Sequence, residues 1–108
     1  MQTLELVTFT SKEGVTQAQV IEANDKVMQE IKHFDGFVYR SLCFQKESKQ
    51  WLDIVYWENA LAAKNAQEKF MTLPCCQMLM SLIDESSTSM LHADVLLDSP
   101  FSEMENCG

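Results

Sequence analysis

Hydrophobic and polar residues change their spacing several times along the chain, and each change marks a predicted element. Apolar side chains recur at every second position in four segments, which is typical of strands, and at helical spacing in the segments between them. The strands are predicted at residues 3–10, 37–45, 51–57 and 90–97, and the helices at residues 17–33, 59–70 and 75–84.

The segment from Trp51 to Trp57 and the alanine-rich residues after it are the centre of this pattern. Aromatic and β-branched residues favour a half-buried strand, and the residues that follow are good helix formers. Pro74 interrupts the helical segment because proline has no backbone N–H and clashes with the preceding turn. Residues 85–89, rich in serine, are expected to form a loop before the last strand.

This order predicts an α+β fold of the ferredoxin-like type, β-α-β-β-α-β, with a four-stranded antiparallel sheet. One domain is expected over residues 1–98, with a flexible C-terminal tail at residues 99–108. The helices can cover only one face of such a sheet, yet the strands at residues 37–45 and 51–57 carry large apolar residues on both faces. The uncovered apolar face predicts a homodimer in which two sheets pack face to face.

The composition narrows the choice of partners. The 108 residues carry a net charge of −8, and their lysines and arginines form no cluster that could bind phosphates, so neither nucleic acid nor an anionic membrane surface is expected as a partner. No apolar run approaches the roughly 20 residues that span a bilayer, and residues 1–5 lack signal-like features. A cytoplasmic location is therefore expected.

Cysteine and histidine spacing predicts no metal site. The four cysteines form no CxxC pair and stand at no metal-ligand spacing from the two histidines. In a reducing cytoplasm they are expected to be reduced thiols packed as small apolar groups. The cysteines are Cys43, Cys75, Cys76 and Cys107.

Three features together resemble a known family: the order of elements, the dimerising sheet, and the segment Trp57-Glu58-Asn59 before an alanine-rich helix that ends near Phe70. The family is the antibiotic biosynthesis monooxygenase-like, dimeric α+β barrel superfamily. The resemblance covers about residues 3–98. It implies a pocket in each subunit between helices and sheet, and its members include cofactor-independent quinone-forming monooxygenases and heme-degrading enzymes. Heme degraders are expected to place an iron-binding histidine in the helix after the tryptophan. Residues 58–70 contain no histidine, so no heme is expected.

Four residues are candidates for a site in that pocket. His92, among apolar residues of the last strand, is the candidate catalytic base because histidine titrates near neutral pH. Trp57, marked by the resemblance, together with Asn24 and Tyr39, is a candidate for binding the substrate. Each also has a purely structural explanation: Trp57 as a core anchor, Asn24 in a local network, and His92 satisfied by a carboxylate or facing solvent.

The cavity itself is expected between the strand at residues 51–57 and the first two helices, with Trp57 in its wall. Small Ala62, Ala63 and Ala66 leave room there. Asp53 needs a partner if it is buried, and Arg40 on the neighbouring strand can form a structural ion pair with it.

Two functions remain open. One is a small-molecule-binding barrel that acts as a cofactor-independent monooxygenase on an aromatic or polyketide-like compound. The other is a non-catalytic small-molecule-binding or sensing module. Both take a small apolar or aromatic ligand, and neither requires a cofactor.

Overall fold

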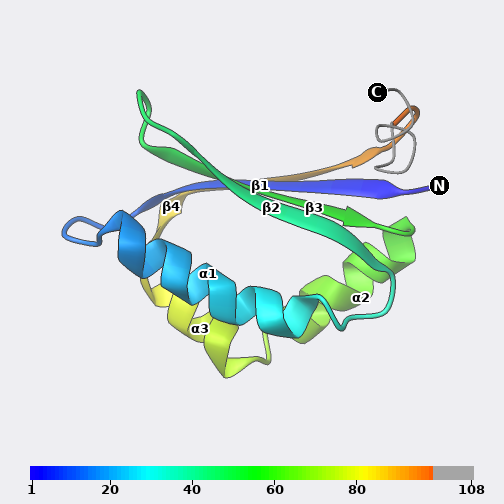
Figure 1. Ribbon diagram of the computed structural model, residues 1–108, viewed down its shortest axis with the longest axis horizontal. Coiled ribbons are helices and arrows are strands. Elements are labelled where there is room, and N and C mark those ends of the chain that lie inside the picture. Colours follow the sequence, from blue (N-terminus) through cyan, green and yellow to red (C-terminus); the bar gives the residue numbers. More distant parts are fainter. Residues whose placement is uncertain (99–108) are drawn as a thin grey trace, which may run out of the picture.

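The computed structural model describes residues 1–98, so the predicted tail at residues 99–108 lies outside the described residues. Four antiparallel strands in the order β2-β3-β1-β4 form one layer, and three helices cover one face of it (Figure 1). The elements are β1 (Thr3–Ser11), α1 (Gln17–Ile31), β2 (Phe37–Gln45), β3 (Gln50–Trp57), α2 (Ala60–Phe70), α3 (Pro74–Ser81) and β4 (Ile83–Asp94).

This architecture confirms the predicted ferredoxin-like α+β fold, with the second helical segment divided into α2 and α3. Pro74 is the first residue of α3, where its missing N–H costs nothing because that group has no partner inside a helix. The other two helices begin with side-chain caps. Thr16 and Gln19 form a capping box at α1, and Asn59 Oδ1 accepts a 2.8 Å hydrogen bond from the Ala62 N–H at α2.

The last strand begins earlier and ends earlier than the sequence predicts. The expected loop at residues 85–89 belongs to β4, which ends at Asp94 rather than at residue 97. Its hydroxyl groups bond to β1: the Thr10 N–H donates to Ser87 Oγ at 2.9 Å, and the hydroxyls of Thr8 and Ser89 are also 2.9 Å apart. The loop prediction is wrong because pairing with a distant strand overrides the weak strand propensity of serine.

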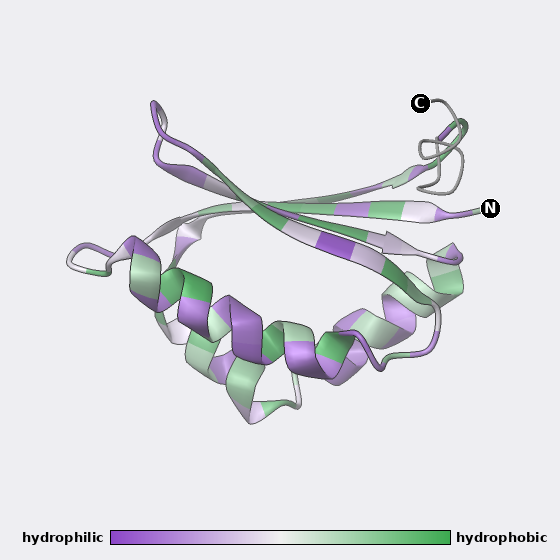
Figure 2. Cartoon of the chain, in the orientation of Figure 1, coloured by the Kyte–Doolittle hydropathy of each residue, from purple (hydrophilic) through white to green (hydrophobic). Residues whose placement is uncertain are grey.

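Hydrophilic and hydrophobic residues follow one another along the strands (Figure 2), and successive side chains point to opposite faces, so the two faces of the sheet differ in composition. The inner face, turned to the helices, includes Glu5, Val7, Phe9, Arg40, Asp53, Val55, Trp57 and His92. The outer face includes Leu4, Leu6, Tyr39, Leu52, Ile54, Tyr56 and Leu91. Within the described residues, no helix or loop covers the outer face (Figure 1).

An irregularity in β2 reverses one predicted position. The pattern places Phe37 on the face of Tyr39, but the register shifts between these residues, so that Phe37 pairs with Trp57 and Tyr39 with Tyr56. One inserted residue reverses the alternation of side chains. The prediction for Phe37 is therefore wrong: its ring lies on the inner face, edge-on to Trp57, with centroids 5.9 Å apart.

Gly36 sets how closely the loop between α1 and β2 passes α2. Its φ of +81° is unfavourable for other residues, and a Cβ atom there would overlap the Cβ of Ala62. The Gly36 carbonyl also accepts a 2.8 Å hydrogen bond from the Glu58 N–H. Glycine and alanine together thus allow the helical layer to close against the inner face.

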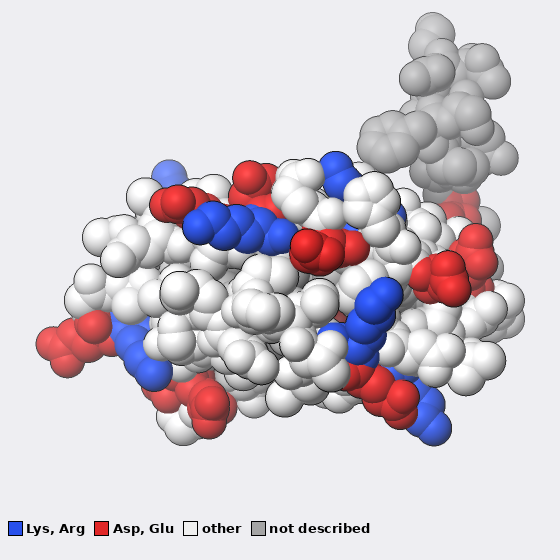
Figure 3. Space-filling view, turned by 90° about the horizontal axis from the view of Figure 1, so that it is seen from below, with Lys and Arg blue, Asp and Glu red and all other residues white. Residues whose placement is uncertain are grey.

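Charged groups on the helical side are spread rather than gathered. Figure 3 shows acidic and basic side chains interspersed around a mostly uncharged centre. No helix in residues 1–98 is long and apolar enough to cross a membrane.

Candidate functional site

A cavity of about 160 Å³ lies between the inner face of the sheet and the helices. Its lining is predominantly apolar and comes from β1, β3, β4 and the helical layer. An apolar cavity with a few convergent polar groups is the usual form of a small-molecule site. The polar side chains on its wall are Glu5, Asp53, Gln67 and Thr88, together with the indole of Trp57.

Trp57 lies at the end of β3 and is only 2% exposed. Its Nε1–H has no hydrogen-bond partner, and neither has the hydroxyl of Thr3, which faces it in register on β1. Buried donors without a partner are rare, because each costs about 1–3 kcal/mol. The indole N–H is thus a buried donor without a partner, and we place the ring of Trp57, rather than its N–H, on the cavity wall.

Asp53 lies on the cavity wall but is held by its neighbour. Both of its carboxylate oxygens accept hydrogen bonds of 2.9 Å from Arg40, whose side chain is 1% exposed. Arg40 also donates a 2.7 Å hydrogen bond to Asn24 Oδ1. The predicted ion pair between Asp53 and Arg40 is confirmed, and the bidentate geometry compensates the charge of Asp53.

Glu5 is the second carboxylate on the wall, and it has no arginine. It faces His92 in register across β1 and β4, and His92 Nε2 lies 3.2 Å from Glu5 Oε1. Burial raises the pKa of the Glu5 carboxyl, and the nearby Asp53 raises it further, while the hydrogen bond and charge of His92 and the charge of Arg40 lower it. The net result is a carboxyl group that binds a proton more readily than an exposed glutamate.

The four sequence-predicted site residues do not meet at one place. Trp57 lines the cavity, and His92 reaches it only through Glu5. Asn24 is buried behind Arg40, with its Nδ2 donating to the Val20 carbonyl at 2.9 Å, and it does not line the cavity. Tyr39 lies on the outer face, 45% exposed and on the opposite side of the sheet from the cavity.

Glu5 is the site residue that the sequence reading did not single out. Glu5, Val7 and Phe9 follow one another at every second position, so a constant strand period places the carboxyl on the same face as two apolar side chains. A carboxyl on an apolar strand face is the signal that could have identified it.

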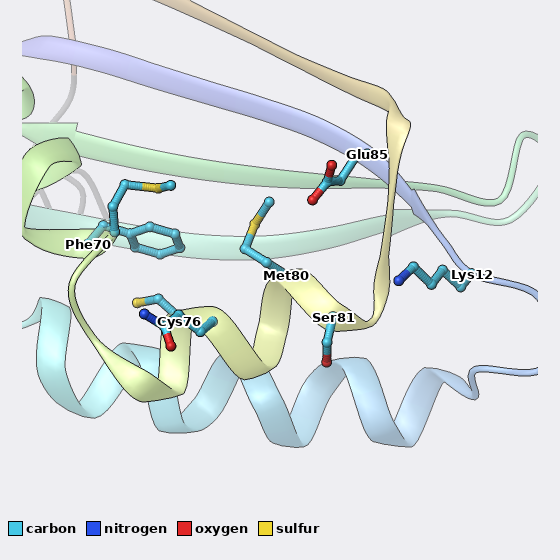
Figure 4. Close-up of a pocket in the computed structure, with 8 residues that line it drawn as sticks. Lys12, Phe70, Cys76, Met80, Ser81 and Glu85 are labelled. Carbon is cyan, nitrogen blue, oxygen red and sulfur yellow. The ribbon is translucent and has the colours of Figure 1, made fainter.

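A more open hollow of about 340 Å³ lies beside the cavity, next to α3 (Figure 4). Its outer wall carries Lys12, Ser81 and Glu85. Phe70, Met71 and Met80 line both spaces. Methionine side chains adapt their shape easily, so this shared boundary can adjust to a ligand longer than the cavity.

The described cysteines are free thiols, as the sequence predicts, but only one is fully packed. Burial raises the pKa of the Cys76 thiol to about 12, and its sulfur lies 4.0 Å from that of Cys75. Cys43 is exposed, and Cys107 lies outside the described residues. Within residues 1–98, no three histidine, cysteine or acidic side chains are grouped so that they could hold a metal ion.

No protein-family model matches the sequence, and no curated protein matches it significantly. Solved structures share its fold. SnoaB, a cofactor-independent oxygenase from Streptomyces nogalater, gives a TM-score of 0.75 at 16% identity, covering 92% of this chain and 97% of its own. A proposed antibiotic biosynthesis monooxygenase from Nitrosomonas europaea gives 0.75 at 12% identity, covering 92% and 94%.

Another proposed antibiotic biosynthesis monooxygenase, from Bordetella bronchiseptica, gives a TM-score of 0.76 at 12% identity, covering 89% of this chain and 98% of its own. These likenesses, all at low sequence identity, confirm the predicted fold.

Proposed function

We propose that this chain, which has the fold of the antibiotic biosynthesis monooxygenase-like superfamily, binds a small aromatic molecule and oxidises it with O₂ without a cofactor. The observation that carries the proposal is the cavity between sheet and helices, which combines apolar walls with the indole of Trp57 and the Glu5 carboxyl. SnoaB, which shares the fold, is described as a cofactor-independent oxygenase.

In such chemistry the substrate supplies the electrons. A phenol with a free para position loses its hydroxyl proton to a base, and the electron-rich phenolate reduces O₂. One oxygen atom becomes a carbonyl at the para carbon, and the other leaves as water with the two hydrogens that the ring has lost. The protein needs to bind the ring, exclude water and accept a proton.

The cavity size selects among aromatic substrates. An engineered cavity of about 150 Å³ in another protein binds benzene, so the 160 Å³ here suits a single ring. A polyketide-like compound with fused rings would have to extend past Phe70, Met71 and Met80 into the neighbouring hollow. A single ring bound there can pack against the indole of Trp57.

We also propose that the functional unit is a homodimer joined through the outer face. In the middle of each strand, the side chains that point outward include no acidic or basic one. These middle parts run from Leu4 to Thr8, Tyr39 to Cys43, Leu52 to Tyr56 and Ser89 to Ala93. Two copies that each carry a net charge of −8 can meet there without bringing carboxylates together. Light scattering should give about twice 12.4 kDa, and a monomer would contradict this.

The oxygenase proposal is tested by oxygen uptake with a panel of one-ring phenols and hydroquinones. With isotopically labelled O₂, one labelled atom should appear in the quinone formed from a phenol. Ligand binding without uptake would assign the chain to the non-catalytic binding or sensing module instead.

Matched tryptophan variants test the placement of the ligand. Trp57→Phe should weaken binding roughly tenfold, because the ring on the cavity wall becomes smaller and buries less of the ligand. Trp51→Phe is the control, since Trp51 is also buried but does not line the cavity. Equal binding by wild type and Trp57→Phe would contradict a ligand packed against the indole.

A further inference from the structure

We propose that Glu5 is the base that takes the proton from the bound substrate, and that His92 is a positioning residue that passes this proton to solvent. The inference deepens the proposed function, since it assigns the proton acceptor of the same cavity. It rests on the position of two side chains that face each other across β1 and β4.

Glu5 is the ionisable group on the cavity wall that remains available to a substrate. Its side chain is 14% exposed and lines the cavity, whereas His92 does not. The other carboxylate on the wall, Asp53, already has both oxygens bonded to Arg40. A base must lie within hydrogen-bond reach of the proton that it removes, and among these groups Glu5 meets that requirement.

The electrostatic surroundings of Glu5 come entirely from the sheet. His92 on β4 is in direct contact, Asp53 lies on β3, and Arg40 on β2 binds Asp53. The cavity-lining side chains of the helical layer carry no ionisable group; they are apolar except for Gln67. Two carboxyls in one cavity with such different partners can take different roles, one as a fixed charge and one as a base.

His92 gives the proton a way out of the cavity. Its ring is 38% exposed, and its Nε2 is 3.2 Å from Glu5 Oε1. In the proposed step the substrate O–H bond breaks, its electron pair stays on the substrate oxygen, and the proton goes to a Glu5 carboxylate oxygen. Glu5 then transfers the proton to neutral His92 Nε2, and Nδ1–H releases a proton to water, which restores the Glu5 carboxylate. The exposed His92 ring regains its starting tautomer by proton exchange with water before the next turnover.

The first test compares Glu5→Gln with wild type in two reactions. One is oxygen uptake with the one-ring phenols. The other is the ring opening of a nitrobenzisoxazole under argon, which needs a base but no oxidant: the base takes the ring C–H proton, the C–H electrons form the nitrile, and the N–O bond breaks to give a coloured phenolate.

Glu5→Gln should lower both rates about 10²- to 10⁴-fold, the usual contribution of a general base, while quenching of tryptophan fluorescence shows that the ligand still binds. Glu22→Gln, the same change on the exposed side of α1, is the matched control and should leave both rates unchanged. Circular dichroism confirms that both variants are folded.

The two reactions separate the two proposals. Ring opening that depends on Glu5, without oxygen uptake, would support the base and overturn the oxygenase. Oxygen uptake that is unchanged in Glu5→Gln would overturn the base and leave the oxygenase standing. A nitrobenzisoxazole that quenches tryptophan fluorescence, and so binds, but is opened by wild type no faster than by free acetate at the same concentration would also overturn the base.

His92→Ala tests the relay through a pH profile. The rate should fall on the acid side as Glu5 becomes protonated, and because His92 lowers the pKa of Glu5, its removal should move this fall to higher pH. In Glu5→Gln the same acid limb should disappear. If His92→Ala lowers the rate by the same factor at every pH and the acid limb stays at the same pH as in wild type, His92 is only structural.

Discussion

The two faces of the sheet reverse the usual distribution of charge. The inner face, covered by helices, carries Glu5, Arg40, Asp53 and His92, while the outer face, uncovered in the described chain, is apolar at its centre. Polar groups are normally placed toward water and apolar groups away from it. This difference underlies our two proposals: that the inner charges serve the cavity and pair with one another, and that the outer face packs against a second copy of the chain.

Neighbouring residues of β3 give the strongest test of this contrast. Val55→Asp puts a third carboxyl among Glu5, Asp53 and Arg40 on the covered face, where Val55 is 2% exposed. The cost should be at least about 4 kcal/mol, because an unpaired charge is buried. Urea denaturation should show unfolding at a much lower urea concentration than in wild type.

Ile54→Asp makes the same change one residue earlier, on the outer face. It should leave the subunit folded but break the dimer, so that light scattering gives about 12.4 kDa and circular dichroism is retained. If Ile54→Asp unfolds the chain as Val55→Asp does, the two faces do not differ in the way proposed.

Removing Arg40 should have the next largest effect. Arg40→Met leaves the Asp53 carboxylate and Asn24 Oδ1 without their partner, at a cost of about 3–5 kcal/mol in the free energy of unfolding. The double variant Arg40→Met, Asp53→Leu should recover most of the lost stability, because neither charge of the buried pair then remains. The exposed pair of Lys26 and Glu22 is the control: Lys26→Met should cost less than about 1 kcal/mol.

Two glycine variants test how the helices close over the inner face. Gly36→Ala should cost about 2–3 kcal/mol, from its positive φ and from overlap with Ala62. Gly14 also has a positive φ, +83°, but has open space around it, so Gly14→Ala should lower the stability only by the backbone strain, about 1 kcal/mol. Equal losses of thermal stability in the two variants would show that the contact with Ala62 is unimportant.

The smallest expected effect is a pH dependence of stability at Glu5. Its pKa is raised on folding, so its contribution to stability is present below the unfolded value and is lost as pH rises through the folded value. Glu5→Gln, which has no such ionisation, should become more stable relative to wild type as pH rises from about 4.5. A stability difference that stays constant with pH would contradict the raised pKa.

The local pattern of the sequence determined most of the architecture. Alternation and helical spacing are properties of neighbouring residues, so the element types, their order, the two faces of β3 and the break at Pro74 follow from the chain itself. The pairing of Arg40 with Asp53 was also accessible, because the two strands are consecutive and a short loop joins them.

Tertiary structure decided what depends on partners far along the chain. Glu5 meets His92, and Thr10 meets Ser87, through the pairing of the first strand with the last, which fixes the start of β4 and the proposed proton path. The shift between Phe37 and Tyr39 likewise exists only in the pairing with β3. A strand can take several registers at similar local energy, and only packing of the whole sheet against its helices selects one.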